Sequence, residues 1–168
     1  MASTLKVDTI AHTGGTTAAT ISSSGAVTLS SASYPQVFHS RATGDQDVTN
    51  SYVDISGCVL TGITPRSANS KFLITGNIFV NLNSGTGMRI RMIKTVGGVD
   101  TVIYTQRNAY AIYQNAGGDH EQNHVTFLDT PNTASAIGYR FQVIEYNTNA
   151  MTLNQGDFSS ITVQEYLG

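Results

Sequence analysis

The sequence has little charge, almost no cysteine and no tryptophan, and these shortages exclude several classes of protein. Charged residues make up 12% of the 168 residues, and the formal net charge is −2. Without a basic excess to neutralise phosphates, nucleic acid is not an expected partner. Cys58 is the single cysteine, so no intrachain disulfide can form. Its position in an apolar run predicts an ordinary buried thiol.

Long apolar runs and helical periodicity are missing as well. No apolar run approaches the length needed to span a bilayer, so we expect no membrane insertion. The first eleven residues contain one lysine and no apolar core, which is unlike a secretory signal and predicts synthesis in a cytoplasm without such export. No helical pattern exceeds one turn, and no repeat of 20 to 50 residues is present.

The residues that are abundant favour strands and turns. Ser, Thr, Asn and Gly are frequent, whereas Lys and Glu are few. Apolar residues reach 40%, which is enough for a hydrophobic core. The sequence therefore predicts an all-β protein.

Residues 71–82 show the clearest strand pattern. Apolar side chains occupy alternate positions, interrupted by Gly76, and this period of two is typical of a strand with one face on a core. The pattern consists of Phe72, Ile74, Ile78, Val80 and Leu82. Leu73 and Phe79 add apolar side chains to the other face. We expect the central strand of an antiparallel β-sandwich, with its second face partly covered by another sheet edge or another subunit.

Further short strands are expected on both sides of this one, separated by turn residues. They cover residues 36–43, 51–55, 58–63, 88–95, 100–106, 108–114, 124–128, 137–146, 151–153 and 160–167. Ser56-Gly57 indicates a bulge, and Gly97-Gly98 indicates a hairpin. Eight or more short strands predict a jelly-roll-like antiparallel β-sandwich over residues 34–168, beginning near Pro35.

Residues 1–33 form a different kind of segment, a short β-rich N-terminal arm. Alternating apolar residues predict short strands, and Ser22–Gly25 predicts a tight hairpin. The candidate partner-binding residues are Leu5, Val7, Ile10, Ile21, Val27 and Leu29. About thirty residues of this composition bury too little surface to fold alone. We therefore expect the arm to intertwine with copies of itself or to dock into another protein.

One segment matches a catalytic pattern, His120-Glu121-Gln122-Asn123-His124, which has the form H-E-x-x-H. That motif binds zinc from a helix, but Gly117-Gly118 precedes this segment and a strand-like run, 125–128, follows it. In a strand, residues four apart lie roughly 13 Å from each other, too far to share a metal. A solvated loop entering a strand is the expectation, with no metal site.

Other chemistry has even less support in the sequence. No further catalytic motif is present, so we expect no enzyme, no catalytic residues and no cofactor. Asp45 and Asp47 could hold Ca²⁺, although a polar turn is the more usual interpretation of such a cluster.

A group of aromatic and amide residues provides the candidate ligand site. Aromatic faces and amide groups suit sugar rings, which makes a glycan site one interpretation; a core edge or a subunit interface is the other. The residues are Tyr104, Asn108, Tyr110, Tyr113 and Asn115. The absence of tryptophan counts against the glycan.

Several phrases of the sequence resemble a known family. STLKVDTI, TGGTTAATI and SSSGAVTLS are similar to the start of phage tail-fibre and related virion structural proteins, notably from phages of marine and cyanobacterial hosts. SYVDISG, SKFLITGNIFVN and FLDTPNTASAIGYRFQV resemble the heads of such proteins. The resemblance implies a homotrimeric, non-enzymatic bacteriophage protein located in the virion, whose N-terminal arm binds other virion proteins.

Three alternatives remain open from the sequence. The resemblance favours a short tail fibre with a host-contacting head, but no long shaft separates arm and head, which keeps a trimeric capsid decoration protein in contention. A carbohydrate-binding module unrelated to virions is a rival from another class. An enzyme would rest on residues 120–124 alone.

Overall fold

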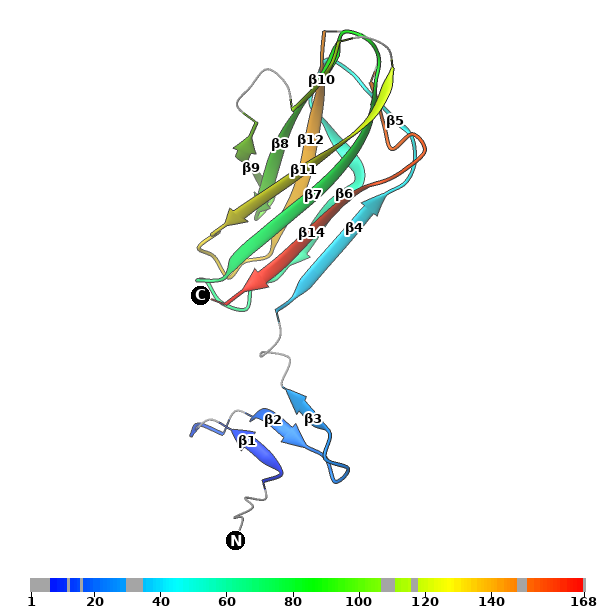
Figure 1. The fold of residues 1–168 in the computed structure, drawn as a ribbon. Coiled ribbons are helices and arrows are strands. Elements are labelled where there is room, and N and C mark those ends of the chain that lie inside the picture. Colours follow the sequence, from blue (N-terminus) through cyan, green and yellow to red (C-terminus); the bar gives the residue numbers. More distant parts are fainter. Residues whose placement is uncertain are drawn as a thin grey trace. The chain divides into compact units, whose positions relative to one another are not determined.

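The computed structural model describes residues 7–11, 13–15, 17–29, 35–106, 111–115, 118–147 and 151–167, and in these ranges every regular element is a β-strand (Figure 1). The chain divides into two compact units, Met1–Gln36 and Val37–Gly168, called here the arm and the head. The all-β prediction is confirmed.

The arm contains a three-stranded antiparallel sheet. Its strands are β1 (Thr9–Ala11), β2 (Thr17–Ile21) and β3 (Val27–Leu29), in that order. The predicted hairpin between β2 and β3 is confirmed, because the Ser22 N–H donates to the Ala26 carbonyl at 2.9 Å. Gly25 takes the left-handed conformation that this turn requires, with φ 81°.

The first sheet of the head, the β7 sheet, is built around the strand that the sequence singled out. Its strands are β4 (Val37–Ala42), β5 (Gln46–Val48), β7 (Lys71–Leu82), β11 (Asp119–Asp129), β13 (Met151–Leu153) and β14 (Ser159–Tyr166). One edge of β7 pairs with β11 along its whole length, and the other edge pairs with β14 and then β13. β4 and β5 form the edge of the sheet on this side, where β4 pairs with β14 and β5 pairs with β13.

The second sheet, the β8 sheet, has the same layout. Its strands are β6 (Val53–Ile63), β8 (Thr86–Val96), β9 (Val99–Thr105), β10 (Ile112–Gln114) and β12 (Ile137–Tyr146). β12 lies between β6 and β8, while β9 and β10 share the far edge of β8. The predicted hairpin at Gly97-Gly98 joins β8 to β9 and is confirmed.

The two sheets together have the connectivity of a jelly roll. Three strand positions in the sandwich are each filled by two consecutive short strands: β4 with β5, β9 with β10, and β13 with β14. If each such position is counted as one row, the head has eight rows, numbered here in chain order. The β7 sheet then reads as rows 1-8-3-6 and the β8 sheet as rows 2-7-4-5. Two four-row antiparallel sheets with crossing connections are the jelly-roll arrangement of viral capsid and lectin domains. The predicted fold class is confirmed.

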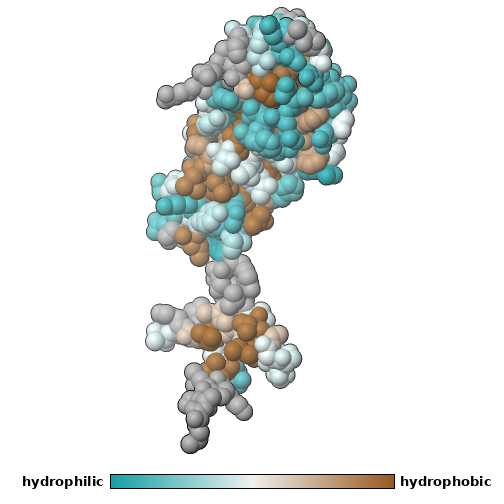
Figure 2. Space-filling model, viewed as in Figure 1, coloured by the Kyte–Doolittle hydropathy of each residue, from teal (hydrophilic) through white to brown (hydrophobic). Residues whose placement is uncertain are grey.

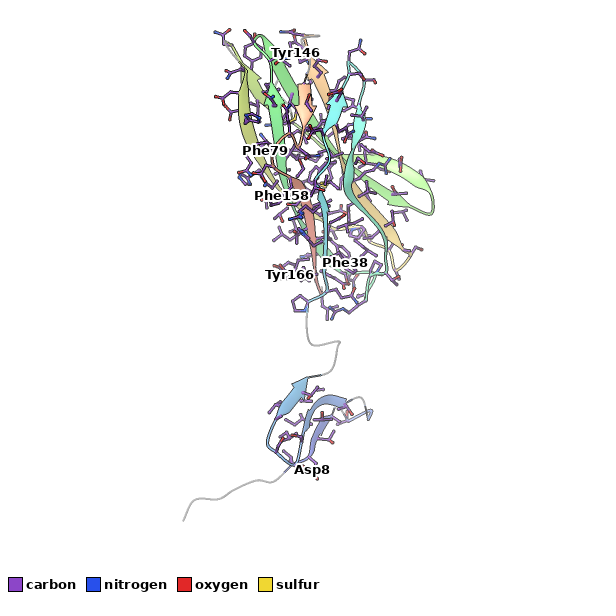
Figure 3. The ribbon with its side chains drawn as sticks, turned by 90° about the vertical axis from the view of Figure 1, so that its right-hand side faces the viewer. Asp8, Phe38, Phe79, Tyr146, Phe158 and Tyr166 are labelled. Carbon is purple, nitrogen blue, oxygen red and sulfur yellow. The ribbon has the colours of Figure 1, made fainter. Side chains whose placement is uncertain are left out.

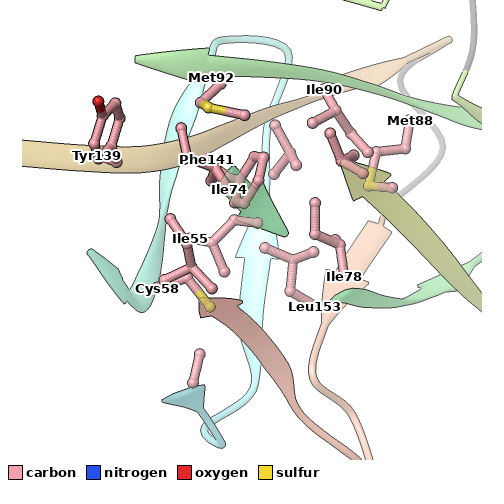
Figure 4. Close-up of a cluster of buried hydrophobic side chains, with 14 of the residues drawn as sticks. Ile55, Cys58, Ile74, Ile78, Met88, Ile90, Met92, Tyr139, Phe141 and Leu153 are labelled. Atoms are coloured by element: carbon pink, nitrogen blue, oxygen red, sulfur yellow. The ribbon is translucent and has the colours of Figure 1, made fainter. Parts of the chain in front are cut away.

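The core lies between the sheets (Figure 4). Every predicted inward residue of β7 is fully buried, from Phe72 to Leu82. They meet Met88, Ile90 and Met92 of β8 and Phe141 of β12, which are also fully buried. This burial supplies the main favourable free energy of the head, at about 25 cal/mol per Å² of apolar surface.

The bulge predicted at Ser56-Gly57 is also present. β6 is one strand rather than two, but its register against β12 shifts between Asp54 and Val59. Gly57 takes a φ of 84°, where a side chain would be strained.

Candidate functional site

The H-E-x-x-H segment lies in a strand, so the expected loop is wrong. β11 begins at Asp119, because the whole segment extends the ladder with β7, with His120 opposite Asn81 and His124 opposite Asn77. Both histidines are exposed on the outer face of the β7 sheet, roughly 13 Å apart along the strand. Within the described ranges, no three His, Cys, Asp or Glu residues are grouped to hold a metal ion.

The described members of the tyrosine and amide group are separated. Tyr104 on β9 lies opposite Met92 and its ring packs against Phe127, with centroids 5.8 Å apart. Tyr113 on β10 lies opposite Gly87, about five residues or ~17 Å further along β8, and is 40% exposed. Asn115 follows β10, while Asn108 and Tyr110 lie outside the described residues. A glycan role for this group stays a prediction.

On the outer face of the β7 sheet, the neighbouring strands β7, β11 and β14 carry almost no charge. Beyond Lys71, the outward positions of β7, β11 and β14 hold no Asp, Glu, Lys or Arg. They are Leu73, Thr75, Asn77, Phe79 and Asn81 on β7; His120, Gln122, His124, Thr126 and Leu128 on β11; and Ser160, Thr162, Gln164 and Tyr166 on β14. Charge-poor surfaces that carry aromatic residues are typical of binding faces.

One end of this face is apolar. Leu73 pairs with Leu128 across the β7–β11 ladder, and Leu128 is 55% exposed. Val37, Tyr166 and Leu167 are exposed at the same end, where β4 begins and β14 ends. We call these five residues the apolar end. Figure 2 shows this face, with apolar surface mainly over the lower half of the head and hydrophilic surface mainly over the upper half.

Toward the other end of the face, the loop between β4 and β5 and the loop between β13 and β14 line a pocket of about 310 Å³. The break between β4 and β5 lies beside the break between β13 and β14, because β4 pairs with β14 and β5 with β13. The pocket is lined by Arg41, Thr43, Asp45, Asn154, Gly156, Asp157 and Phe158. The Arg41 guanidinium lies over the Phe158 ring, 4.9 Å from its centroid. We call this the loop-pair pocket.

Asn154 ties the two loops together beneath the pocket. Its side-chain Nδ2 donates to the Gly44 carbonyl at 3.1 Å, and its backbone N–H donates to the Phe79 carbonyl at 3.1 Å. Its φ of 62° is left-handed, which asparagine tolerates better than most residues. Asn154 is 1% exposed, and its Oδ1 is buried without a hydrogen-bond partner.

An aromatic pair lies next to the loop-pair pocket. The Phe79 ring stacks on the His120 imidazole with centroids 5.6 Å apart, and the Phe79 N–H donates to the Ser159 hydroxyl at 3.0 Å. Asn81 donates to Gln155 on the same face. Figure 3 shows Phe79 and Phe158 on one side of the head. The backbone of Phe79 is therefore joined to the loop that lines the pocket.

The outer face of the β8 sheet is charged, and its charged side chains contact either each other or neighbouring polar and aromatic side chains. Arg140 bonds Asp54 at 2.8 Å and also bonds Asp100. The hydrogen bonds from Arg140, and a further one from Thr95, hold the pKa of the Asp100 carboxyl below its usual value. Arg91 lies 3.8 Å from the centroid of the Tyr52 ring. These contacts give the three arginine and aspartate side chains of this group, and Arg91, partners within the head.

The described candidate residues of the arm are largely exposed. Val7, Ile10 and Val27 are 38%, 52% and 60% exposed, and Ile21 is half-buried. Leu5 lies outside the described residues. Leu29 ends β3, opposite Ala19, which is buried. The arm sheet therefore offers apolar side chains for contact.

Comparison with known proteins gives a structural likeness and no sequence family. No protein-family model and no curated protein matches the sequence. A chain in the structure of infectious bursal disease virus strain Gx matches with a TM-score of 0.50 and 12% identity, over 80% of this chain and 32% of that chain. A chain of that virus's VP2 subviral particle gives 0.49 and 10%, over 77% and 32%.

The chain thus spans about a third of the length of these viral chains. At 12% identity the likeness to the strain Gx structure shows a shared β-sandwich fold. No helix in the described part of the chain is long and apolar enough to cross a membrane.

Proposed function

We propose that this chain is a non-enzymatic structural protein of a bacteriophage virion, a short trimeric tail fibre whose arm anchors it and whose head contacts the host. The observation that carries the proposal is the pairing of a jelly-roll head with a small β arm whose apolar residues are exposed. An arm of this kind gains its order from other chains, by strand addition or intertwining. The resemblance of its sequence to tail-fibre N-termini points in the same direction.

The fold supports a virion role in a second way. The viral chain that shares the fold comes from a virus structure, and jelly rolls are a common architecture of viral capsid domains. The described residues group no ligands for a metal ion, and residues 120–124, the one catalytic pattern, lie in a strand. These features of the described residues agree with a structural role, which requires neither a metal site nor a catalytic site.

The apolar end is the surface that we assign to contact between subunits. Leu73, Leu128 and Tyr166 lie on neighbouring strands that carry a single outward charge, that of Lys71 opposite Tyr166. A second copy can cover the three apolar side chains while the long Lys71 side chain keeps its ammonium group in water. Three copies related by a three-fold rotation axis close such contacts into a ring, so that no apolar contact surface stays exposed.

A trimeric capsid decoration protein is the second candidate. The absence of a shaft between arm and head favours it, since a fibre must project from the particle whereas a decoration protein lies on the shell. In that case the arm would lie along shell proteins rather than in a baseplate or neck.

Sedimentation of the full chain at micromolar concentration tests the trimer. We expect a mass near three times 17.9 kDa. Leu128→Gln, which removes an exposed apolar side chain from the apolar end, should shift the equilibrium toward monomer. Val99→Gln is the matched control, because Val99 is also exposed but lies on the other sheet. A monomeric or dimeric full chain would overturn the proposal.

A further inference from the structure

We infer that the loop-pair pocket and the adjacent Phe79–His120 pair form a carbohydrate-binding site. This inference goes beyond the virion role, because it assigns a ligand class and a place on the head, and a decoration protein could carry the same site. The pocket differs from the tyrosine group that the sequence suggested and lies on the opposite sheet.

The pocket is rich in hydrogen-bond acceptors with one strong donor. Asp45 and Asp157 contribute carboxylates, Thr43 contributes a hydroxyl, and Arg41 contributes a guanidinium. The Asp157 Oδ1 accepts the Phe158 N–H at 2.9 Å, which fixes the carboxylate at the pocket rim. Sugar hydroxyls both donate and accept, so neighbouring hydroxyls of one ring match a carboxylate beside an arginine.

The buried amide of Asn154 marks the floor of the site. Buried polar atoms are nearly always satisfied in folded proteins, yet its Oδ1 has no hydrogen-bond partner. Asn154 lines the pocket, so a ligand hydroxyl that enters between the two loops supplies the missing donor. Asn154 is held in place by its bonds to Gly44 and Phe79, so its side chain is already organised for binding.

A cation is the main rival occupant, and Arg41 argues against it. Two carboxylates and an amide oxygen could ligate Ca²⁺. The Arg41 guanidinium lines the same pocket and is held there by the Phe158 ring. A fixed positive charge beside the carboxylates repels a divalent cation but donates to sugar hydroxyls.

The aromatic pair extends the site across the sheet. Phe79 is half-buried with its ring on the outer face, and its backbone bonds both ends of the loop that forms the pocket, at Asn154 and Ser159. An aromatic face packs against the C–H face of a sugar ring. The Asn81–Gln155 pair on the same face provides amide groups for hydroxyls. The site therefore suits an oligosaccharide with one residue in the pocket and the next over Phe79.

The test is a glycan array probed with the labelled full-length chain, followed by calorimetric titration of the bound oligosaccharide. Asp45→Asn, Asp157→Asn and Arg41→Ala should each weaken binding at least about tenfold, since each removes a charge-assisted hydrogen bond. Asp100→Asn is the control for loss of a carboxylate charge, because Asp100 lies on the opposite sheet, where it accepts hydrogen bonds from Thr95 and Arg140. Thermal melting checks that each variant is folded.

The outcomes separate the site from its rivals. Loss of binding in the pocket variants with retention in Asp100→Asn and Tyr113→Ala supports the inference. Binding of no glycan overturns it, as does loss in Tyr113→Ala alone, which would favour the tyrosine group. Ca²⁺ binding at the pocket without any glycan also overturns it. None of these results changes the sedimentation mass, so failure here and failure of the trimer are distinguishable.

Discussion

Gly76 on β7 faces the ring of Phe141 on β12, and a side chain at position 76 would overlap that ring. This contact explains why the apolar alternation of residues 71–82 is broken by a glycine. The two sheets approach each other here so closely that the Phe141 ring fills the space of the missing side chain.

Gly76→Ala should therefore destabilise the head by about 1–3 kcal/mol, because the added methyl group overpacks the core. Urea unfolding followed by fluorescence measures the change in the free energy of unfolding. Gly44→Ala is the control, since a Cβ there meets no atom within 4 Å. Equal stability of the two variants would contradict the packing described for β7 and β12.

Stability should fall at alkaline pH because of Cys58. Burial raises the pKa of this thiol from 9.0 to about 11. Above pH 9 the unfolded chain releases the thiol proton while the folded chain keeps it. The contribution of the protonated thiol to the free energy of unfolding is thus fully present below pH 9 and is lost as the pH rises to 11. The loss amounts to roughly 2–3 kcal/mol.

Urea unfolding of the wild type and of Cys58→Ala at pH 7, 9 and 10.5 measures this effect. Burial also raises the pKa of Tyr139, so both proteins should lose stability above pH 10. The difference between them isolates the thiol. Parallel curves for the two proteins would mean that Cys58 is not buried in the folded chain.

Residues 120–124 should bind no zinc. His120 and His124 lie on one strand, roughly 13 Å apart, which exceeds the span of any single ion's ligands. We expect well under one zinc per chain by elemental analysis of protein purified without added metal, and normal folding of the His120→Ala/His124→Ala double variant. A stoichiometric zinc would be incompatible with the strand assignment of β11.

Arm and head should have separable roles. The core residues of the sandwich lie in Val37–Gly168, so a chain beginning at Ser33 should fold with a cooperative urea transition. Removal of the arm should abolish incorporation into particles while leaving the fold of the head intact. An unfolded truncated chain, or one incorporated as well as the full chain, would refute this division.

The sequence predicted the elements of this fold better than its sites. Alternation along β7, β8 and β12 is a local signal, since each core position is marked by its neighbours two residues away. β11 was predicted too short because its first residues are polar and owe their strand conformation to pairing with β7.

The loop-pair pocket could not be predicted in the same way. Its two loops are brought together by sheet pairing, and the bond that joins them links Asn154 to Gly44, 110 residues away in the chain. A contact between residues so far apart in the chain produces no periodicity and no characteristic spacing in the sequence. The pocket's one amide, Asn154, and its two carboxylates, Asp45 and Asp157, are typical turn residues. Only the register of β4 with β14 shows that they lie together.

Electron microscopy of phage particles labelled with an antibody against the head tests the central claim most directly. We expect label at a fixed position on intact particles. Label on the tail would identify the fibre, whereas label on the shell would identify the decoration protein. Absence of the chain from purified particles would contradict the assignment of a virion structural protein.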